Sequence, residues 1–213
     1  MNREIIIHLH SIIGIIVFAT GFLQILLKKG GIRHKIIGQV YLYGWLVLLI
    51  SGAYLGGLLI TIIGVFGFYF ALTGSRIGHL KNKAITVFEN LIFTIGGLLA
   101  LSMLYYSITL FMKGHQSFAI IFAVFGGIFL FTTVQDISKY IFNKPLKKQI
   151  HGKLDWYFEH FTRMCISFIA AVTAFTSIQN VFGDNTLNFI MPTIIGVILI
   201  AFATRSYKKK LLK

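Results

Sequence analysis

Two histidines have similar sequence surroundings. Their imidazoles can take part in more kinds of chemistry than the other side chains of this protein. His34 begins the pattern His-Lys-Ile-Ile-Gly, and His160 lies four residues after Trp156. Each follows a basic segment and precedes a long apolar run. An imidazole at the start of an apolar helix can ligate a metal or haem iron, carry a proton or bind an anion. We expect His34 and His160 to face a common interior cavity and to bind haem b or zinc there.

Four of the five remaining histidines extend this set. His79 and His151 are predicted on the same side of a membrane as the first pair, and His8 and His10 on the other side. Because His8 and His10 are two residues apart, they point about 200° apart on a helix and do not chelate one ion together. The sequence contains no His-x-x-x-His, Cys-x-x-Cys-His or His-Glu-x-x-His motif. A histidine that is hydrogen-bonded in a polar core is the alternative to a ligand.

Ionisable side chains recur near the basic ends of the apolar runs. A buried carboxylate needs a cation or a metal beside it. We therefore predict that Glu89 or Asp136 pairs with Arg76 or Arg163 inside a bundle. The polar side chains expected to support the histidines are Gln24, Gln39, Arg76, Glu89, Asp136, Glu159 and Arg163. Four of them, Arg76, Arg163, Glu89 and Asp136, are instead typical of a transporter or sensor coupled to a proton or a small anion.

The composition decides which class of protein must position these groups. Of the 213 residues, 56% are hydrophobic and 12% are charged, whereas soluble chains carry about 25% charged residues. This composition predicts a polytopic membrane protein and excludes a soluble one. The net charge of +14 does not indicate nucleic-acid binding, because the basic residues cluster in short segments between apolar runs. Cys165 is the single cysteine, which excludes an internal disulfide.

Seven apolar runs are long enough to cross about 30 Å of hydrocarbon as helices. The 40 residues from Ile36 to Ser75 carry no charged side chain. As one helix they would be about 60 Å long, so they are expected to cross twice. The glycines of residues 51–57 predict the turn. The expected spans are residues 5–27, two within 36–75, then 84–112, 117–138, 156–181 and 187–204.

The distribution of basic residues predicts the orientation. With seven spans, 18 of the 20 Lys and Arg residues fall on one side, and only Arg3 and Lys113 fall on the other. The positive-inside rule then places the C-terminus in the cytoplasm and the N-terminus outside. We expect one all-α domain over residues 1–213, a seven-helix bundle that crosses the inner (cytoplasmic) membrane. The lipid bilayer is its expected partner, together with a small molecule or ion, and no nucleic acid.

Two patterns carry a resemblance. Arg33-His34-x-x-x-Gly38-x-x-Tyr41 and Trp156-x-x-x-His160-x-x-Arg163-Met164 resemble a family of small polytopic bacterial membrane proteins. The resemblance covers about residues 8 to 180 and implies about seven spans, without an established activity. The spacing from histidine to glycine is also similar to that of haem-b membrane cytochromes. This sequence departs from the cytochromes, because no facing pair of histidines is assigned to the outer leaflet.

Four functional hypotheses follow. The first is a histidine-centred site in the cytoplasmic half that binds haem b or a metal ion for redox or metal-dependent chemistry. The second is the proton- or anion-coupled transporter or sensor described above. A zinc-dependent intramembrane hydrolase has a similar topology, but its His-x-x-x-His signature is missing here. The fourth is an accessory membrane protein without catalytic activity.

Overall fold

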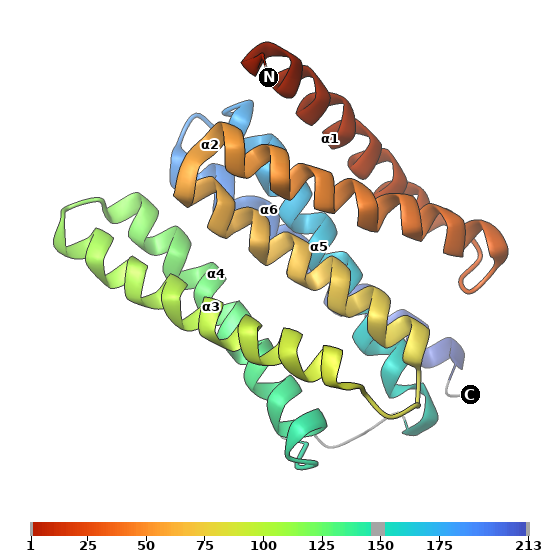
Figure 1. Cartoon of the computed structure of the whole chain (residues 1–213). Helices are drawn as coiled ribbons and strands as arrows, with labels where there is room; N and C mark the ends of the chain where they lie inside the picture. Colours follow the sequence, from red (N-terminus) through yellow and green to blue (C-terminus); the bar gives the residue numbers. More distant parts are fainter. Residues whose placement is uncertain (1, 146–151, 212–213) are drawn as a thin grey trace.

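The protein is a bundle of long helices (Figure 1). The computed structural model describes residues 2–145 and 152–211, without the side chains of residues 57–59 and 153. All regular secondary structure in these residues is helical. The helices are α1 (Arg3–Leu26), α2 (Ile32–Leu80), α3 (Val87–Met112), α4 (Gln116–Asp136), the π-helix η1 (Ile137–Ile141), the 3₁₀-helix η2 (Gly152–Leu154), α5 (Asp155–Ile178) and α6 (Asn185–Leu211).

Helix α2 forms a hairpin, although its helical hydrogen bonding continues over all 49 residues. A straight helix of that length would span about 74 Å, more than twice the hydrocarbon thickness. A methyl group on Gly67 would lie 2.2 Å from the Trp45 ring, and one on Gly64 would lie 3.3 Å from Leu49. The two halves of α2 therefore lie side by side, as Figure 1 shows. The contacts of Gly64 with Leu49 and of Gly67 with Trp45 centre the reversal near residue 56, within the predicted turn at 51–57.

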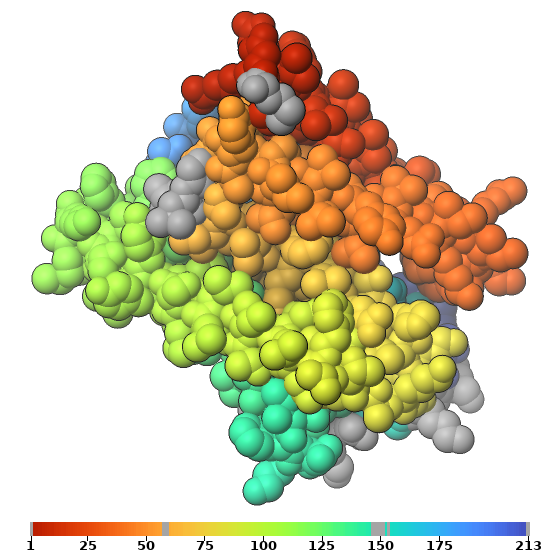
Figure 2. Space-filling view, viewed as in Figure 1, coloured from red at the N-terminus to blue at the C-terminus, as the bar shows by residue number. Residues whose placement is uncertain are grey.

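With α2 counted as two halves, seven helical segments in the described residues are long and apolar enough to cross a membrane. The number agrees with the sequence prediction. The outer faces support the same conclusion, because large apolar side chains such as Ile15, Tyr105 and Phe202 are exposed. A water-soluble protein rarely exposes apolar surface of this extent. Figure 2 shows one such face, made largely by α2 and α3, with α1 along one edge.

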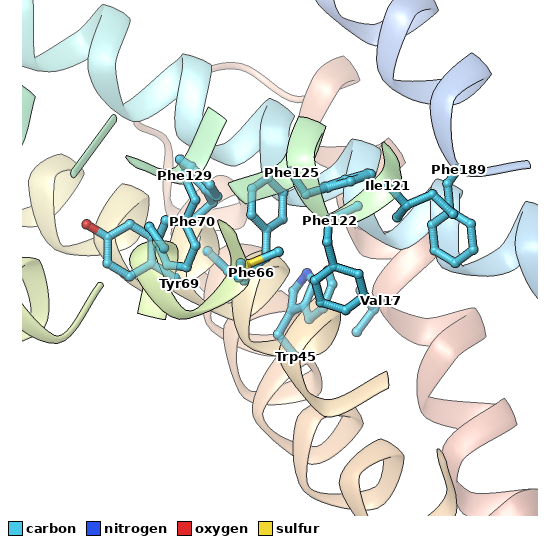
Figure 3. Packing of buried hydrophobic residues seen from close by; sticks show 14 of the residues in the cluster. Val17, Trp45, Phe66, Tyr69, Phe70, Ile121, Phe122, Phe125, Phe129 and Phe189 are labelled. Atoms are coloured by element: carbon cyan, nitrogen blue, oxygen red, sulfur yellow. The ribbon is translucent and has the colours of Figure 1, made fainter. Parts of the chain in front are cut away.

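Aromatic side chains fill the centre of the bundle. Phe66 and Phe70 from α2 pack against Phe125 and Phe129 from α4 (Figure 3). The ring centres of Phe66 and Phe125 lie 5.1 Å apart in a T-shaped contact, a favourable arrangement for aromatic pairs. This packing fixes the second half of α2 against α4. It thereby sets the positions of the polar groups one to two turns further along both helices.

One end of the bundle collects basic residues, and we call it the basic end. It carries the segments 28–35, 81–83, 139–144 and 205–210. The Lys81 ammonium lies 5.5 Å from the centre of the Trp156 ring. The Lys208 ammonium lies 5.8 Å from the centre of the Phe158 ring. These contacts place the ends of α2 and α6 beside the start of α5, as expected because two crossings separate each of these ends from it.

The turn between α5 and α6, at the opposite end, is held by buried polar groups. Pro192 lies inside α6 and has no N–H to donate to the carbonyl oxygen of Asn188, four residues earlier. The Thr176 hydroxyl donates to that oxygen instead, at 2.7 Å. The Asn188 side chain accepts a hydrogen bond from the Phe182 N–H and donates one to Asn180. A cross-helix hydrogen bond thus replaces the one that proline removes.

Candidate functional site

His34 and His160 lie together at the basic end. His34 is in the first turn of α2 and His160 is in the second turn of α5. Their ring centres are 6.3 Å apart, and the ring planes are inclined at 75°. Both side chains are partly buried. The prediction that the two rings lie close together is confirmed, and a shared ligand stays a prediction. Their common interior cavity stays a prediction.

The His160 ring is fixed by the second half of α2. Its Nδ1 lies 2.7 Å from the carbonyl oxygen of Gly74. Because a carbonyl oxygen only accepts, Nδ1 carries the proton and donates it, which leaves the Nε2 lone pair for a ligand. A methyl group on Gly78 would lie 2.6 Å from Nδ1. The glycines of the Gly74-x-x-x-Gly78 segment therefore create the space that the imidazole fills.

His34 is tied to α1 through its backbone. The Gln24 side-chain amide donates to the His34 carbonyl oxygen at 2.7 Å. Gly38, one turn along α2, leaves room for this amide, since a methyl group there would lie 3.2 Å from it. Within the described residues, His34 Nδ1 and Gln24 Oε1 are buried and have no hydrogen-bond partner. Buried polar atoms of this kind are costly unless a ligand or water satisfies them.

Lys29 brings a positive charge to the same place. Its ammonium donates to the carbonyl oxygens of Gln24 at 2.5 Å and Ile25 at 3.0 Å, at the C-terminus of α1. Lys29 interacts electrostatically with both imidazoles and with Cys165. Partial burial lowers the pKa of the Lys29 ammonium, because desolvation disfavours its charged form. The site therefore combines two imidazoles with a cation that suits an anionic group.

A second polar cluster lies deeper in the bundle. The Arg163 guanidinium, on α5, forms an ion pair with Asp136 at the end of α4. The hydroxyl of Tyr69 also donates to Asp136, at 3.2 Å, and Arg163 donates to the Thr73 hydroxyl at 3.0 Å. All four residues are buried. The cluster of these four residues joins α2, α4 and α5.

A third cluster lies at the turn between α2 and α3. Arg76 Nε donates to Glu89 Oε1 at 2.6 Å. The other Glu89 oxygen accepts from the Thr86 N–H at 2.8 Å and from the Thr86 hydroxyl at 2.5 Å. Glu89 thus caps α3 in addition to its ion pair. Together with the Arg163–Asp136 pair, this contact confirms the prediction that the acidic residues pair with Arg76 and Arg163.

Glu159 belongs to a fourth contact, with the π-helix η1. It forms an ion pair with Lys139 and accepts a hydrogen bond from the Tyr140 hydroxyl at 2.6 Å. The wider winding of η1 follows directly after Asp136. Short π-helical turns are frequent at functional sites, where they redirect side chains. Glu159 contacts η1 from α5, and Asp136 directly precedes η1, so both carboxylates lie near this turn.

Several predicted site residues lie apart from these clusters. Gln39 and His79 are exposed on α2, so neither belongs to the buried clusters, and the support of the histidines by Gln39 stays a prediction. His79 and Arg76 lie within α2 rather than in the following loop, because the helix continues to Leu80. His8 is exposed on α1. His151 lies outside the described residues.

His10 makes a structural contact far from the basic end. Its Nδ1 lies 2.8 Å from the Ser51 hydroxyl, and that hydroxyl donates to the Val47 carbonyl oxygen at 2.6 Å. His10 Nδ1 is therefore the donor to Ser51. The contact fixes α1 against α2 close to the α2 reversal. In this position His10 acts as a hydrogen-bonded core histidine.

Sequence reasoning missed Lys29, Tyr69, Thr73 and Tyr140. Tyr69 stands in a phenylalanine-rich run, where nothing in the pattern separates a hydrogen-bonding tyrosine from a packing aromatic. For the His160 site, the sequence did contain a signal. The Gly74-x-x-x-Gly78 spacing indicates close packing of another helix, because small residues four apart allow close approach in membrane helices. Residues 2–145 and 152–211 contain no group of three or more His, Cys, Asp or Glu side chains arranged to hold a metal ion.

Comparisons with known proteins add no relative. The chain matches no family model, no curated protein and no solved structure. The resemblance drawn from the Arg-His-x-x-x-Gly and Trp-x-x-x-His-x-x-Arg patterns therefore stays a prediction.

Proposed function

We propose that this protein binds haem b between His34 and His160 and serves redox chemistry at the inner (cytoplasmic) membrane. In this proposal the N-terminus is outside, the C-terminus is in the cytoplasm, and the basic end faces the cytoplasm, as the positive-inside rule favours. The observation that carries the proposal is the separation of the two imidazoles. Two rings on opposite sides of one metal have centres roughly 6 Å apart, because each nitrogen lies about 2 Å from the metal. The observed separation is 6.3 Å.

The tautomer of His160 supports the same proposal. Metal-ligating histidines usually donate their second ring N–H to a carbonyl or carboxylate oxygen, which orients the ring. His160 makes such a bond to Gly74 through Nδ1. His34 has a buried Nδ1 without a partner among the described residues. One imidazole is therefore oriented and the other offers a free nitrogen.

The number of ligands and the charge favour haem over zinc. A structural or catalytic zinc usually has at least three protein ligands, whereas a haem iron needs only two axial ligands. Haem b also carries two anionic propionates, and Lys29 in the 28–35 segment brings a positive charge that acts on both imidazoles. A bare divalent cation would be repelled by that ammonium.

The experiment is purification from cells supplied with a haem precursor, followed by absorption spectroscopy and elemental analysis. We expect a Soret band and about one iron per chain. His34→Ala and His160→Ala should each abolish the band while the protein stays in the membrane. His79→Ala, which removes an exposed histidine at the same end, is the matched control and should keep it. Colourless wild-type protein with zinc would favour a zinc site instead, and protein with neither metal would refute the proposal.

A specific observation favours a second proposed function, the proton- or small-anion-coupled transporter or sensor. The buried Arg163–Asp136 pair is joined to Tyr69 and Thr73 by hydrogen bonds. Ionisable groups in the interior of membrane bundles often mark ion or proton pathways. Proton uptake into vesicles containing the purified protein should then require Asp136, and Asp136→Asn should abolish it. Equal uptake by protein-free vesicles would refute transport.

A further inference from the structure

An apolar groove opens on the side of the bundle, lined by residues of α2, α4, α5 and α6. It has a volume of about 270 Å³, and its inner surface is apolar. Phe66 and Phe125, both buried, form its floor, and their labelled rings lie side by side in Figure 3. Helices α5 and α6 form its walls, with Ile166 and Val197 among the lining residues. The groove is thus a place where four helical segments leave their packing incomplete.

The shape of the groove fits a single hydrocarbon chain. Along α6 it extends from Thr193 to Ala201, which is about 12 Å at the helical rise. A methylene group is about as large as a water molecule, about 30 Å³, so the volume holds about nine of them. An additional helix, about 10 Å across, is too wide for this space. Two threonines, Thr162 and Thr193, also line the groove, and the Thr193 hydroxyl donates to the Phe189 carbonyl oxygen.

The charge at one end of the groove indicates which headgroup the bound hydrocarbon chain carries. Beyond Ala201, the last two turns of α6 carry Arg205, Lys209 and Lys210, all exposed. Lys208 lies about 10 Å from Ala201 along the helix axis. An anionic phosphate at the membrane surface is attracted to such a cluster by about 1 kcal/mol per basic residue. The groove therefore lies below a cationic surface of the kind that holds a phospholipid headgroup.

We propose that this groove binds one acyl chain of an anionic phospholipid, whose headgroup contacts the basic residues 205–210 of α6. The lipid then fills the gap between α4, α5 and α6 and acts as part of the packed structure. No charged side chain is among the described residues that line the groove, so the lining does not select one headgroup. The proposal is therefore limited to an anionic diacyl phospholipid such as phosphatidylglycerol.

The test uses the full-length protein in nanodiscs of equal parts phosphatidylglycerol and phosphatidylethanolamine. The phosphatidylglycerol carries a photoreactive diazirine in the middle of one acyl chain, and mass spectrometry locates the labelled residues. We expect the label on segments 166–170 and 197–201, well above its level on the lipid-facing sides of α1 and α3. Uniform labelling of all exposed helix faces would overturn the proposal, because it would show only the lipids that surround any membrane protein.

Two neighbouring residues of α6 give a matched pair of variants. Val197 lines the groove, and Ile198 is exposed but is not part of the lining. Val197→Trp should lower labelling of segment 166–170 roughly tenfold, as expected when about two buried methylene groups are displaced. Ile198→Trp should leave it unchanged. The assignment would be overturned if both variants lowered the labelling of segment 166–170 equally, or if neither variant lowered it. If Val197→Trp fails to fold, the wild-type labelling pattern decides.

The headgroup is tested separately. Replacement of Lys208, Lys209 and Lys210 by glutamine should remove the preference for phosphatidylglycerol over phosphatidylethanolamine carrying the same diazirine. Labelling in the groove itself should persist at a lower level. A free fatty acid with the same diazirine distinguishes the two sources of a hydrocarbon chain. If it labels the groove as strongly in the lysine variant as in the wild type, the occupant is a fatty acid and the phospholipid proposal is wrong.

Discussion

At the scale of single residues, the position of His160 depends on a glycine. A methyl group on Gly78 would lie 2.6 Å from Nδ1 of the ring, so Gly78→Ala must displace either the imidazole or the helix. We expect this variant to lose bound haem and to be destabilised by about 1–3 kcal/mol, as in other overpacked sites. Iron content and thermal unfolding in detergent are the measurements.

Gly127→Ala is the control for this substitution. A methyl group on Gly127, in α4, meets nothing within 4 Å. The helix should gain up to about 1 kcal/mol from the better helix former, and haem binding should not change. Normal haem content in Gly78→Ala would show that the ring does not need this space.

The buried ion pair gives a second prediction at this scale. Asp136 and Arg163 are both buried, so removing one partner leaves an uncompensated charge. We expect Asp136→Leu to cost about 3–5 kcal/mol, and the double variant Asp136→Leu with Arg163→Met to cost less. Unfolding in mixed micelles measures both. Additive losses would contradict a direct pair.

From the residue types it could be predicted that each buried carboxylate pairs with an arginine, but not which arginine pairs with which carboxylate. Sequence reasoning required a cation near each of Glu89 and Asp136, because an unpaired buried carboxylate is too costly. It gave no choice between Arg76 and Arg163 for either one. That choice follows from the packing of the second half of α2 against α5, which depends on side chains far apart in the sequence. Tyr69 and Thr73 enter the cluster for the same reason.

At the scale of helices, the Pro192 position gives a further prediction. Thr176 donates to the Asn188 carbonyl oxygen that Pro192 leaves unpaired. Thr176→Val should therefore cost about 1–3 kcal/mol, the penalty for an unsatisfied buried acceptor. In a Pro192→Ala background the restored N–H can bond to the same oxygen, and the cost of Thr176→Val should fall. Thermal unfolding of the four proteins measures this coupling, and equal costs in both backgrounds would contradict it.

The helices themselves were predictable within a few residues, because long apolar runs leave no alternative to helix in a membrane. The exceptions have local causes. The second half of α2 continues to Leu80, since Arg76 pairs with Glu89 and needs no loop to reach water. The π-helix η1 has no signature in the sequence, since it arises where Tyr140 and Lys139 meet Glu159.

At the scale of the whole molecule, the number of crossings decides which side each loop faces. The seven apolar segments and the segregation of basic residues predict a cytoplasmic C-terminus. A fluorescent protein fused after Lys213 should fluoresce, and alkaline phosphatase there should be inactive. The same reporters inserted at Gly114 should give the reverse pattern. The same result at both positions would contradict the seven-span topology.

In the proposed function, His34 and His160 together bind one haem iron. Near-infrared magnetic circular dichroism of the purified oxidised protein tests it directly, because the position of the charge-transfer band identifies both axial ligands at once. We predict the signature of two imidazoles in the wild type. In His34→Ala this signature should be lost even if some haem remains bound. A wild-type spectrum with any other ligand pair, such as imidazole with the amine of Lys29, would contradict the shared site.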